Sequence, residues 1–444
     1  MNLHLTWNHA YLGRVRSEAA FGREEKEKFL SQAKEGKLPF LTLEHIPELE
    51  KDLAFSSDFL AGFKHMLLLG IGGSALGARV LQKAFAPGQD RPGHTGPWLW
   101  IADNVCADTL EGYMHGLDPA KTVVVVVSKS GGTIETISQY FLIRDWMERE
   151  LGEKWPKHFI LVTDPDKGFL RQECRTYGIR SLPVPQEMGG RYSVLSAVGL
   201  LPAQFLGLDW KEIVAGAREA AEGILSQGPE LDNGSASGFA GLALWAVDLI
   251  RAGYSQLIFF NYIPEWAALG DWFAQLWAES LGKNGLGSTP LPAVGVTDQH
   301  SLQQLFLDGP ADKGCMFISA GNMNPGPAFS SGLPRKWGHL HGRRFGDLLQ
   351  AEALGTQMAL TERQVPLIHL RAESPDLRVA GRLLVGLEGM TYLTGLLLGI
   401  NPLDQPAVEL GKRLANAELG AEGFEAEKER LQESKAAKKV KEVV

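Results

Sequence analysis

Two segments rich in small and hydroxyl residues each follow a short apolar run and could bind an anion. The first is Gly70-Ile71-Gly72-Gly73-Ser74-Ala75-Leu76-Gly77, after the apolar run 65–69. Glycines let a backbone approach a phosphate, and a helix that begins there adds positive potential. The segment also fits G-x-G-x-x-A, so a nicotinamide or flavin site with Asp103 as ribose ligand stays open, as does a tight turn without ligand.

The second segment, Ser128-Lys129-Ser130-Gly131-Gly132-Thr133, follows the run Val123–Val127 and precedes a predicted helix. Three hydroxyls and a lysine at one helix N-terminus suit a single phosphate monoester, which accepts hydrogen bonds from hydroxyl and backbone donors. The alternative is structural, with Ser130 or Thr133 capping the helix and Lys129 in solvent. The chain contains no G-x-x-x-x-G-K-[ST], so a nucleoside triphosphate loop is not indicated.

Glu279 is a candidate general base. On a helix over 271–283 it falls on the same side as Trp272 and Leu276, facing the core. Desolvation there would make its carboxylate a competent base for a carbon-bound proton next to a carbonyl. The alternative is a surface ion pair with Lys283, one helical turn away.

Arg191 and His300 are two further candidates. Arg191 follows Gly189 and Gly190, so its guanidinium could be held as a fixed cation, although an ordinary salt bridge fits the local sequence as well. His300 is of the residue type that commonly passes a proton to or from an oxygen near neutral pH, but a lone histidine is more often structural. The sequence alone does not choose between these alternatives.

The elements that must position these residues alternate along the chain. Apolar runs at 65–69, 98–101, 123–127 and 159–162 alternate with predicted helices from Ser74, near Asp108, from Thr133 and near Lys167. The pattern recurs as a helix over 238–250, a strand over 256–261, a helix from Trp266, a strand over 316–319, a helix over 345–360, a strand over 365–370 and a helix over 379–398. Continuous apolar strands are typical of parallel sheets covered on both faces.

The sequence therefore predicts an α/β protein with two doubly wound, mainly parallel sheets, helices on both faces, and extra helices at the N- and C-termini. We expect an N-terminal helical segment over 1–35, a first domain over 36–226, a second over 227–420, and a charged C-terminal helix over 421–444. The polar stretch 227–238 is predicted to link the domains.

Composition narrows the classes of partner. The 444 residues carry 44 Lys and Arg against 52 Asp and Glu, a formal charge of −8, which argues against nucleic acid as a partner. Cys106, Cys174 and Cys315 fit neither a disulfide framework nor a zinc motif, so a cytoplasmic location is expected. The stretch 1–11 does not have the pattern of a signal peptide, and 383–400 is predicted to be a buried core helix, not a membrane span.

The two loops resemble the paired loops of sugar-isomerase domains, and four further motifs narrow the resemblance to the glucose-6-phosphate isomerase family, bacterial type. These are Gly189–Ser196, Glu279–Lys283, Thr297–Ser301, and Ile400–Gln405 continuing to Val408–Lys412. The motifs span nearly the whole chain in the family's order. Gly132 and Ala407 depart from the family's usual threonine and glycine, and Gly132 removes one hydroxyl from the phosphate loop.

The resemblance implies reversible isomerisation of glucose 6-phosphate to fructose 6-phosphate, in glycolysis and gluconeogenesis, through a cis-enediol(ate). It implies that Glu279 moves the proton between C2 and C1, that Arg191 faces the enediolate, and that His300 and Lys412 open the ring. It further implies a homodimer in which His300 enters the neighbouring subunit's site, with no metal and no cofactor. The implied substrate contacts are Gly73, Ser74, Ser128, Lys129, Ser130, Thr133, Gly190 and Gln405.

Three alternatives remain at this level. A catalytically silent regulator that binds sugar phosphates would keep the phosphate loop and could lose Glu279, Arg191 or His300, all of which are present. A dehydrogenase would bind a nicotinamide cofactor. An isomerase of this family could also accept mannose 6-phosphate.

Overall fold

The computed structural model describes residues 3–7, 15–16, 18–226 and 238–437. The predicted linker lies outside the described residues except for Gly238, as does most of the N-terminal stretch. The chain separates into two compact units, Met1–Pro402 and Leu403–Val444, each described by itself below.

The first sheet of the larger unit is entirely parallel. Its order is β3 (Trp98–Ala102), β2 (His65–Leu69), β4 (Thr122–Ser128), β5 (Phe159–Thr163) and β6 (Arg180–Pro183). Four of these strands were predicted, and every residue of β4 and β5 is buried, as the unbroken apolar runs indicate. The short edge strand β6 was not predicted, because it begins with Arg180 and Ser181 and ends in proline.

The second sheet repeats the arrangement. Its order is β1 (Leu3–Trp7), β10 (Leu367–Ala372), β9 (Lys313–Ala320), β7 (Gln256–Asn261) and β8 (Thr289–Val294). Only β1 is antiparallel, with Leu5 opposite Leu370. The sequence predicted β7, β9 and β10 but not β8, whose two prolines are compatible with an edge strand, nor β1, which lies in a segment expected to be helical.

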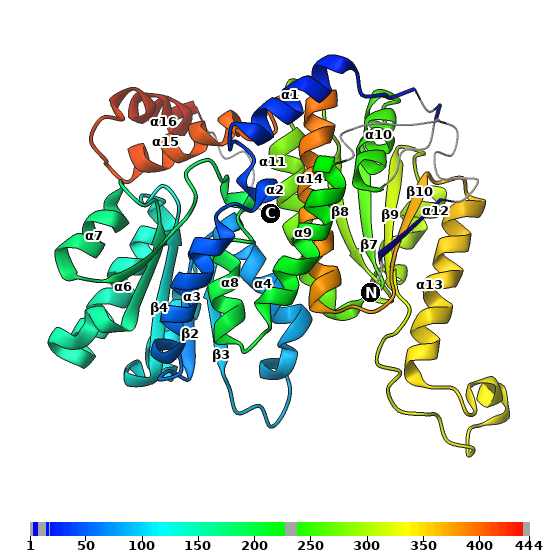
Figure 1. Cartoon of the computed structure of the whole chain (residues 1–444), viewed down its shortest axis with the longest axis horizontal. Helices are drawn as coiled ribbons and strands as arrows, with labels where there is room; N and C mark the ends of the chain where they lie inside the picture. Colours follow the sequence, from blue (N-terminus) through cyan, green and yellow to red (C-terminus); the bar gives the residue numbers. More distant parts are fainter. Residues whose placement is uncertain (1–2, 8–14, 17, 227–237, 438–444) are drawn as a thin grey trace. The chain divides into compact units, whose positions relative to one another are not determined.

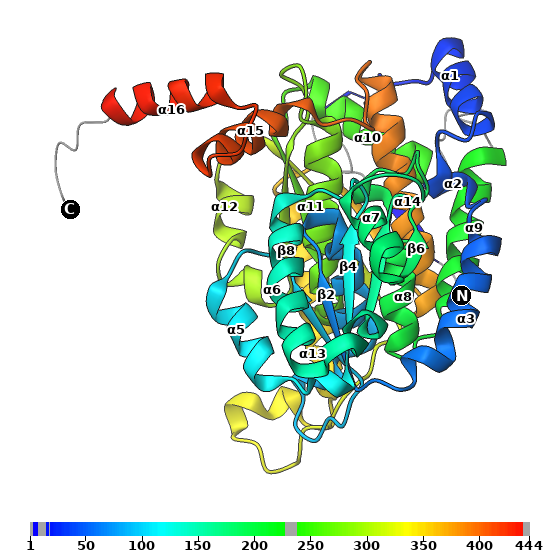
Figure 2. The same ribbon diagram turned by 90° about the vertical axis from the view of Figure 1, so that its left-hand side faces the viewer.

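Helices cover the outer face of each sheet (Figures 1 and 2). On the first sheet, α5 (Ala107–Gly116), α6 (Ile134–Leu151) and α7 (Phe169–Tyr177) pack against alternate strand residues such as Leu67 and Val124 in one apolar core. On the second, α12 (Gln303–Asp308) and α13 (Phe345–Glu362) pack on Phe260 and Phe317 in another. Alternate strand residues point to opposite faces, which leaves the other face for a second layer of helices.

The helices between the two sheets in Figure 1 are α4 (Leu76–Phe85), α8 (Ala197–Phe205), α9 (Trp210–Ser226), α11 (Ala267–Leu281) and α14 (Leu377–Leu397). Glycines bring two of them into backbone contact. A Cβ on Gly216 of α9 would lie 1.7 Å from the Arg378 carbonyl oxygen, and one on Gly381 of α14 would lie 1.8 Å from that of Ile213. The prediction of a buried core helix near 383–400 is thereby confirmed.

The structure confirms the predicted fold class. The remaining helices of the larger unit are α1 (Arg23–Lys34), α2 (Pro39–Thr42), α3 (Ile46–Leu60) and α10 (Gly238–Arg251). Within the smaller unit, α15 (Glu409–Glu418) and α16 (Glu425–Ala437) are joined by an ion pair between Arg413 and Glu427 at 2.6 Å. Among the described helices, none combines the length and apolar character that crossing a membrane requires.

Candidate active site

The glycine loop after β2 is built for close approach of neighbouring segments. Gly72 has φ +55°, a conformation that favours glycine, and a Cβ there would lie 2.7 Å from Nε2 of Gln275 on α11. A Cβ on Gly73 would lie 2.3 Å from the carbonyl oxygen of Gly190. The loop therefore contacts both the turn that holds Arg191 and the helix that holds Glu279, with Ser74 at its end.

The hydroxyl loop after β4 keeps its hydroxyls together instead of capping the helix. Ser128 Oγ lies 3.0 Å from Thr133 Oγ1, and Ser130 Oγ lies 3.5 Å from the same atom. Thr133 is the N-cap residue of α6, yet its side chain accepts no hydrogen bond from the first turn of the helix. The capping alternative is therefore wrong for Thr133, whose side chain leaves the first-turn amides of α6 uncapped.

Lys129 is not simply solvated. Its residue is half-buried at the carboxyl end of β4, and its carbonyl oxygen accepts a hydrogen bond of 3.1 Å from the amide of Asp164. Burial lowers the pKa of Lys129, while the nearby Glu187 and Asp164 carboxylates act in the opposite direction. The backbone of Lys129 is therefore fixed, and its side chain is partly withdrawn from water.

The two loops leave the sheet at neighbouring strands. β2 and β4 pair directly, with Leu69 opposite Val126, and the chain enters the sheet at β2 before adding strands on both sides of it. In doubly wound sheets, ligands bind outside the carboxyl ends of the strands at this reversal of strand order. Asp103, the ribose ligand of the dinucleotide alternative, is instead ion-paired with Arg79 at 2.6 Å.

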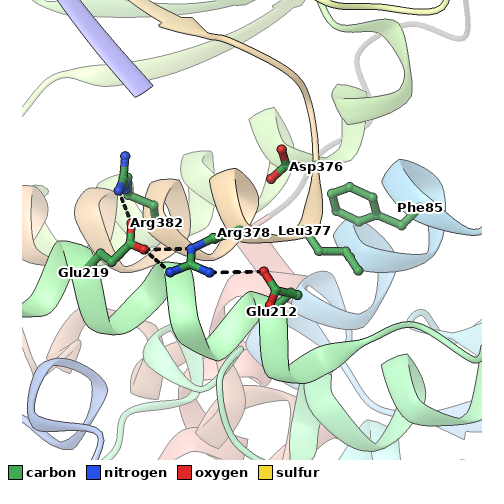
Figure 3. A pocket seen from close by; sticks show the side chains of 7 residues that line it. All are labelled: Phe85, Glu212, Glu219, Asp376, Leu377, Arg378 and Arg382. Carbon is green, nitrogen blue, oxygen red and sulfur yellow. Dashed lines mark hydrogen bonds and ion pairs between the residues drawn. The ribbon is translucent and has the colours of Figure 1, made fainter. Parts of the chain in front are cut away.

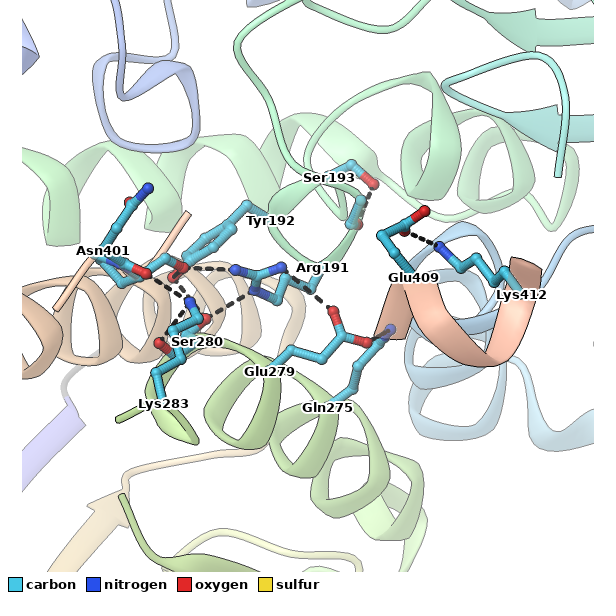
Figure 4. A network of polar contacts seen from close by, with 12 residues as sticks. Arg191, Tyr192, Ser193, Gln275, Glu279, Ser280, Lys283, Asn401, Glu409 and Lys412 are labelled. Carbon is cyan, nitrogen blue, oxygen red and sulfur yellow. Dashed lines mark hydrogen bonds and ion pairs between the residues drawn. The ribbon is translucent and has the colours of Figure 1, made fainter. Parts of the chain in front are cut away.

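Arg191 is a fixed, buried cation. Its side chain is 2% exposed, and its three nitrogens each have a partner. Nε donates to Ser280 Oγ at 2.8 Å, Nη2 donates to the Pro402 carbonyl oxygen at 2.6 Å, and Nη1 lies 3.3 Å from Glu279 Oε2 (Figure 4). The guanidinium therefore cannot swing into solvent, and one edge of it faces Glu279.

Glu279 lies in the last turn of α11 and touches this cation. Its side chain is 32% exposed, so the expected removal from water is only partial. Oε2 lies on Arg191, and Oε1 accepts a hydrogen bond of 2.9 Å from Gln275 Nε2. The partner considered in the alternative, Lys283, donates to the carbonyl oxygens of Ser280 and Asn401. The carboxylate is thus oriented on both oxygens while remaining open to a small molecule.

Sequence reasoning missed the residues that orient this pair. Gln275 was not singled out, and Tyr192, Ser280 and Pro402 were noted only as parts of motifs. Tyr192 is fully buried, and its hydroxyl lies 3.0 Å from Ser280 Oγ and donates to the Pro402 oxygen at 3.3 Å. A usable signal existed for Gln275, because residues four apart share one helix face.

The structure does not join His300 to the contacts described above. It is exposed in the turn after β8, next to the 3-10 segment Thr297–Gln299. Asp298 stiffens this turn by accepting hydrogen bonds from the Val294 amide at 2.7 Å and the Ser301 hydroxyl at 2.6 Å. The histidine is therefore presented outward on a defined turn.

Lys412 and Gln405 belong to the smaller unit, which begins at Leu403. Lys412 lies on α15, where its Nζ donates to Glu409 Oε1 at 2.8 Å, and its side chain is about half exposed. Gln405 precedes the 3-10 segment Pro406–Val408. Their relation to Glu279 stays a prediction.

A different pocket, of about 660 Å³, lies at the start of α14 and contains two arginines (Figure 3). Both are neutralised within it. Arg378 lies 2.6 Å from Glu219 and 3.4 Å from Glu212, and Arg382 also pairs with Glu219. An anionic ligand would have to displace these carboxylates, so the pocket is a poor candidate for the phosphate.

Comparison with known proteins decides the family. The model of the family described as phosphoglucose isomerase matches residues 56–320, more than half of the chain. The chain belongs to the phosphoglucose isomerase family. This membership confirms the resemblance inferred from the six motifs, and it places both loops, Arg191, Glu279 and His300 within the matched region.

Relatives of this phosphoglucose isomerase family member extend the match over most of the chain. A glucose-6-phosphate isomerase of Rubrobacter xylanophilus is 39% identical over 87% of this chain and 89% of its own. One from Carboxydothermus hydrogenoformans is 33% identical over 95% of each chain. The crystal structure of a hypothetical protein from Thermus thermophilus superposes with a TM-score of 0.79 at 32% identity, covering 90% of this chain and 94% of that one.

Proposed function

We propose that this protein interconverts glucose 6-phosphate and fructose 6-phosphate. The observation that carries the proposal is the Arg191–Glu279 pair, 3.3 Å apart, packed against the same glycine loop whose strand adjoins the hydroxyl loop. A cation that faces a carboxylate beside an anion-binding edge is what proton transfer next to a carbonyl requires. The names of the relatives support the same activity.

The proposed chemistry assigns one task to each group. Ser128, Lys129, Ser130 and Thr133, with Gly73, Ser74 and Gly190 beside them, hold the sugar phosphate. The Glu279 carboxylate removes the proton from C2 of the open-chain aldose and returns it to C1, while a proton moves between O1 and O2. Arg191 stabilises the negative charge that develops on these oxygens in the enediolate. These steps call on no cofactor and no metal.

Ring opening is assigned to residues that the described contacts do not join to Glu279. We propose that His300 exchanges the proton with the ring oxygen, that Lys412 contacts the same region, and that Gln405 hydrogen-bonds the substrate. The exposed position of His300 suits a side chain that serves the neighbouring subunit of a homodimer. The expected domain boundaries, at 35/36, 226/227 and 420/421, are likewise proposals.

The cellular location is proposed to be the cytoplasm. Cys106, Cys174 and Cys315 are all free thiols, and the last two are buried. Free buried thiols are compatible with a reducing compartment.

A coupled assay of the purified protein with fructose 6-phosphate tests the proposal. Glucose 6-phosphate should form at a rate that added chelator leaves unchanged. Mannose 6-phosphate as the second substrate separates a strict from a dual isomerase. If inorganic phosphate and the sugar phosphates bind but no conversion occurs, the silent regulator replaces this proposal. Binding of a nicotinamide cofactor would favour the dehydrogenase.

A further inference from the structure

The turn between β5 and α7, residues 163–168, packs behind the hydroxyl loop. The amide of Asp164 donates to the Lys129 carbonyl oxygen at 3.1 Å, and the amide of Leu170 donates to that of Gly131 at 3.3 Å. These two hydrogen bonds hold the loop backbone on both sides of Ser130. Both engage carbonyl oxygens of the loop, so they use none of its side chains.

Gly168 is the closest point of this contact. Its φ is +95°, and a Cβ there would lie 2.6 Å from the Ser130 carbonyl oxygen and 3.3 Å from the Gly131 Cα. Gly131 itself has φ +65°. Any side chain at position 168 would have to displace the Ser130 peptide, whose neighbours supply the donors for the anion.

Asp164 gives the turn its rigidity. It is 5% exposed, and its Oδ1 accepts hydrogen bonds from the amides of Asp166 at 2.9 Å and Lys167 at 3.1 Å. These amide donors lower the pKa of the Asp164 carboxyl. Its carbonyl oxygen also accepts a hydrogen bond of 2.9 Å from Arg171 Nε. The side chain, the backbone and α7 therefore fix one conformation of the turn.

We propose that Gly168 and Asp164 are positioning residues for the monoester site, which set the geometry of Lys129, Ser130 and Gly131 without touching the substrate. The inference rests on the proposed phosphate site and adds residues that support the backbone of its loop. A displacement of about 1 Å in a binding group is enough to cost a large factor in affinity or rate.

Two glycines at the ends of α7 provide a matched test. Gly168 precedes the helix and Gly178 follows it at φ +64°, where a Cβ would meet nothing within 4 Å. Both Gly168→Ala and Gly178→Ala place a Cβ at positive φ, but only the first displaces the loop. Gly168→Ala should raise KM for glucose 6-phosphate roughly tenfold or more and change kcat less than about threefold. Gly178→Ala should leave both constants as in the parent protein.

Calorimetric titration with inorganic phosphate provides a readout that needs no turnover. The Kd for phosphate should rise in Gly168→Ala by the same factor as KM and stay unchanged in Gly178→Ala. Unchanged phosphate binding in Gly168→Ala, or an equal loss in Gly178→Ala, would overturn the proposal. If the parent protein lacks isomerase activity but this pattern of phosphate binding holds, the proposed function fails and the positioning role stands.

A second pair of variants keeps the test decisive if Gly168→Ala does not fold. Asp164→Asn retains an oxygen that can accept from the amides of Asp166 and Lys167, whereas Asp164→Ala removes it. Phosphate affinity should fall in Asp164→Ala and be kept in Asp164→Asn. Equal affinity in both variants and in the parent protein would contradict the role of the turn.

Discussion

The two sheets share the order of four parallel strands and differ in their fifth strand and in the chemistry at their strand ends. In both, the first of these four parallel strands, β2 or β7, is an inner strand, and the chain adds the next strand on one side of it and the later ones on the other. In doubly wound sheets, a ligand binds outside the carboxyl ends of the strands at this reversal of strand order. In the first sheet, the two strands at this position run into the glycine and hydroxyl loops.

At the corresponding end of β7, the polar side chain forms its hydrogen bonds within its own turn. Asn261 is 1% exposed, its Nδ2 donates to the Ile263 carbonyl oxygen at 3.0 Å, and its Oδ1 accepts from the Ile263 amide at 3.0 Å. Glu279 and Ser280 lie instead in the last turn of α11, which begins after this turn. The comparison teaches that the same reversal of strand order can carry different side-chain chemistry: hydroxyls and a lysine follow β4, whereas Asn261 at the end of β7 bonds within its own turn.

The largest expected effect comes from replacing Glu279, the proposed base. Glu279→Gln keeps the oxygen that faces Arg191 and removes the ability to take a proton, so kcat should fall by about 10²- to 10⁴-fold with KM and the melting temperature little changed. The exposed Glu265, just before α11, supplies the control Glu265→Gln, which should be fully active. Near-parent turnover in Glu279→Gln would refute the assignment.

Arg191→Lys should have the next largest effect. A lysine cannot reach Ser280, Pro402 and Glu279 at once, so kcat should fall roughly 10²-fold and the melting temperature should drop. Arg378→Lys is the matched control, because Arg378 is also ion-paired but lines the pocket of Figure 3. Steady-state kinetics and thermal melts of both variants measure the difference. A loss of kcat as large in Arg378→Lys would remove the special role of Arg191.

The carboxyl ends of β4 and β7 can be compared by substitution. Lys129→Ala combined with Ser130→Ala should raise KM roughly 10- to 100-fold, because hydrogen bonds to a charged ligand are lost, with little effect on melting. Asn261→Ala should show the reverse, a lower melting temperature with an unchanged KM, because its hydrogen bonds are internal. If Asn261→Ala raised KM and the double variant did not, the anion would belong to the second sheet.

The smallest effect on catalysis is expected from a buried histidine of the second sheet. Burial, with Arg371 nearby, lowers the pKa of His369 to about 4, and its Nε2 lies 2.7 Å from Ser319 Oγ. Between about pH 6.5 and 4 the unfolded chain binds the extra proton, so the free energy of unfolding falls as pH is lowered through that window, by roughly 3 kcal/mol in total.

His369→Gln should flatten this pH dependence and leave kcat at neutral pH near that of the parent protein. Urea unfolding at several pH values measures the slope. The same slope in both proteins would show that other groups cause the acid sensitivity.

Sequence reasoning was most successful where one element carries its own signal. The unbroken Val123–Val127 run predicted the buried β4. The period of α11 placed Glu279 on the side of the buried Trp272 and Leu276, although its side chain is 32% exposed. It failed at edge strands such as β8, because proline interrupts the apolar pattern there. An edge strand tolerates proline because it pairs with a neighbour on one side only.

The hydrogen-bond partners of Arg191 could not be predicted either. Ser280 and Pro402 come from segments about 90 and 210 residues away, and local sequence patterns do not report contacts between segments so far apart. Local patterns and the family resemblance thus predicted candidate groups, and tertiary packing determines how Arg191 and Glu279 are held.

A crystal structure with fructose 6-phosphate bound tests the central claim most directly. The account predicts that the phosphate accepts hydrogen bonds from the loop 128–133, and that a carboxylate oxygen of Glu279 lies within roughly 3.5 Å of C1 and C2. A phosphate bound anywhere else, at the end of β7 for example, or a Glu279 carboxylate out of reach of both carbons, would contradict it.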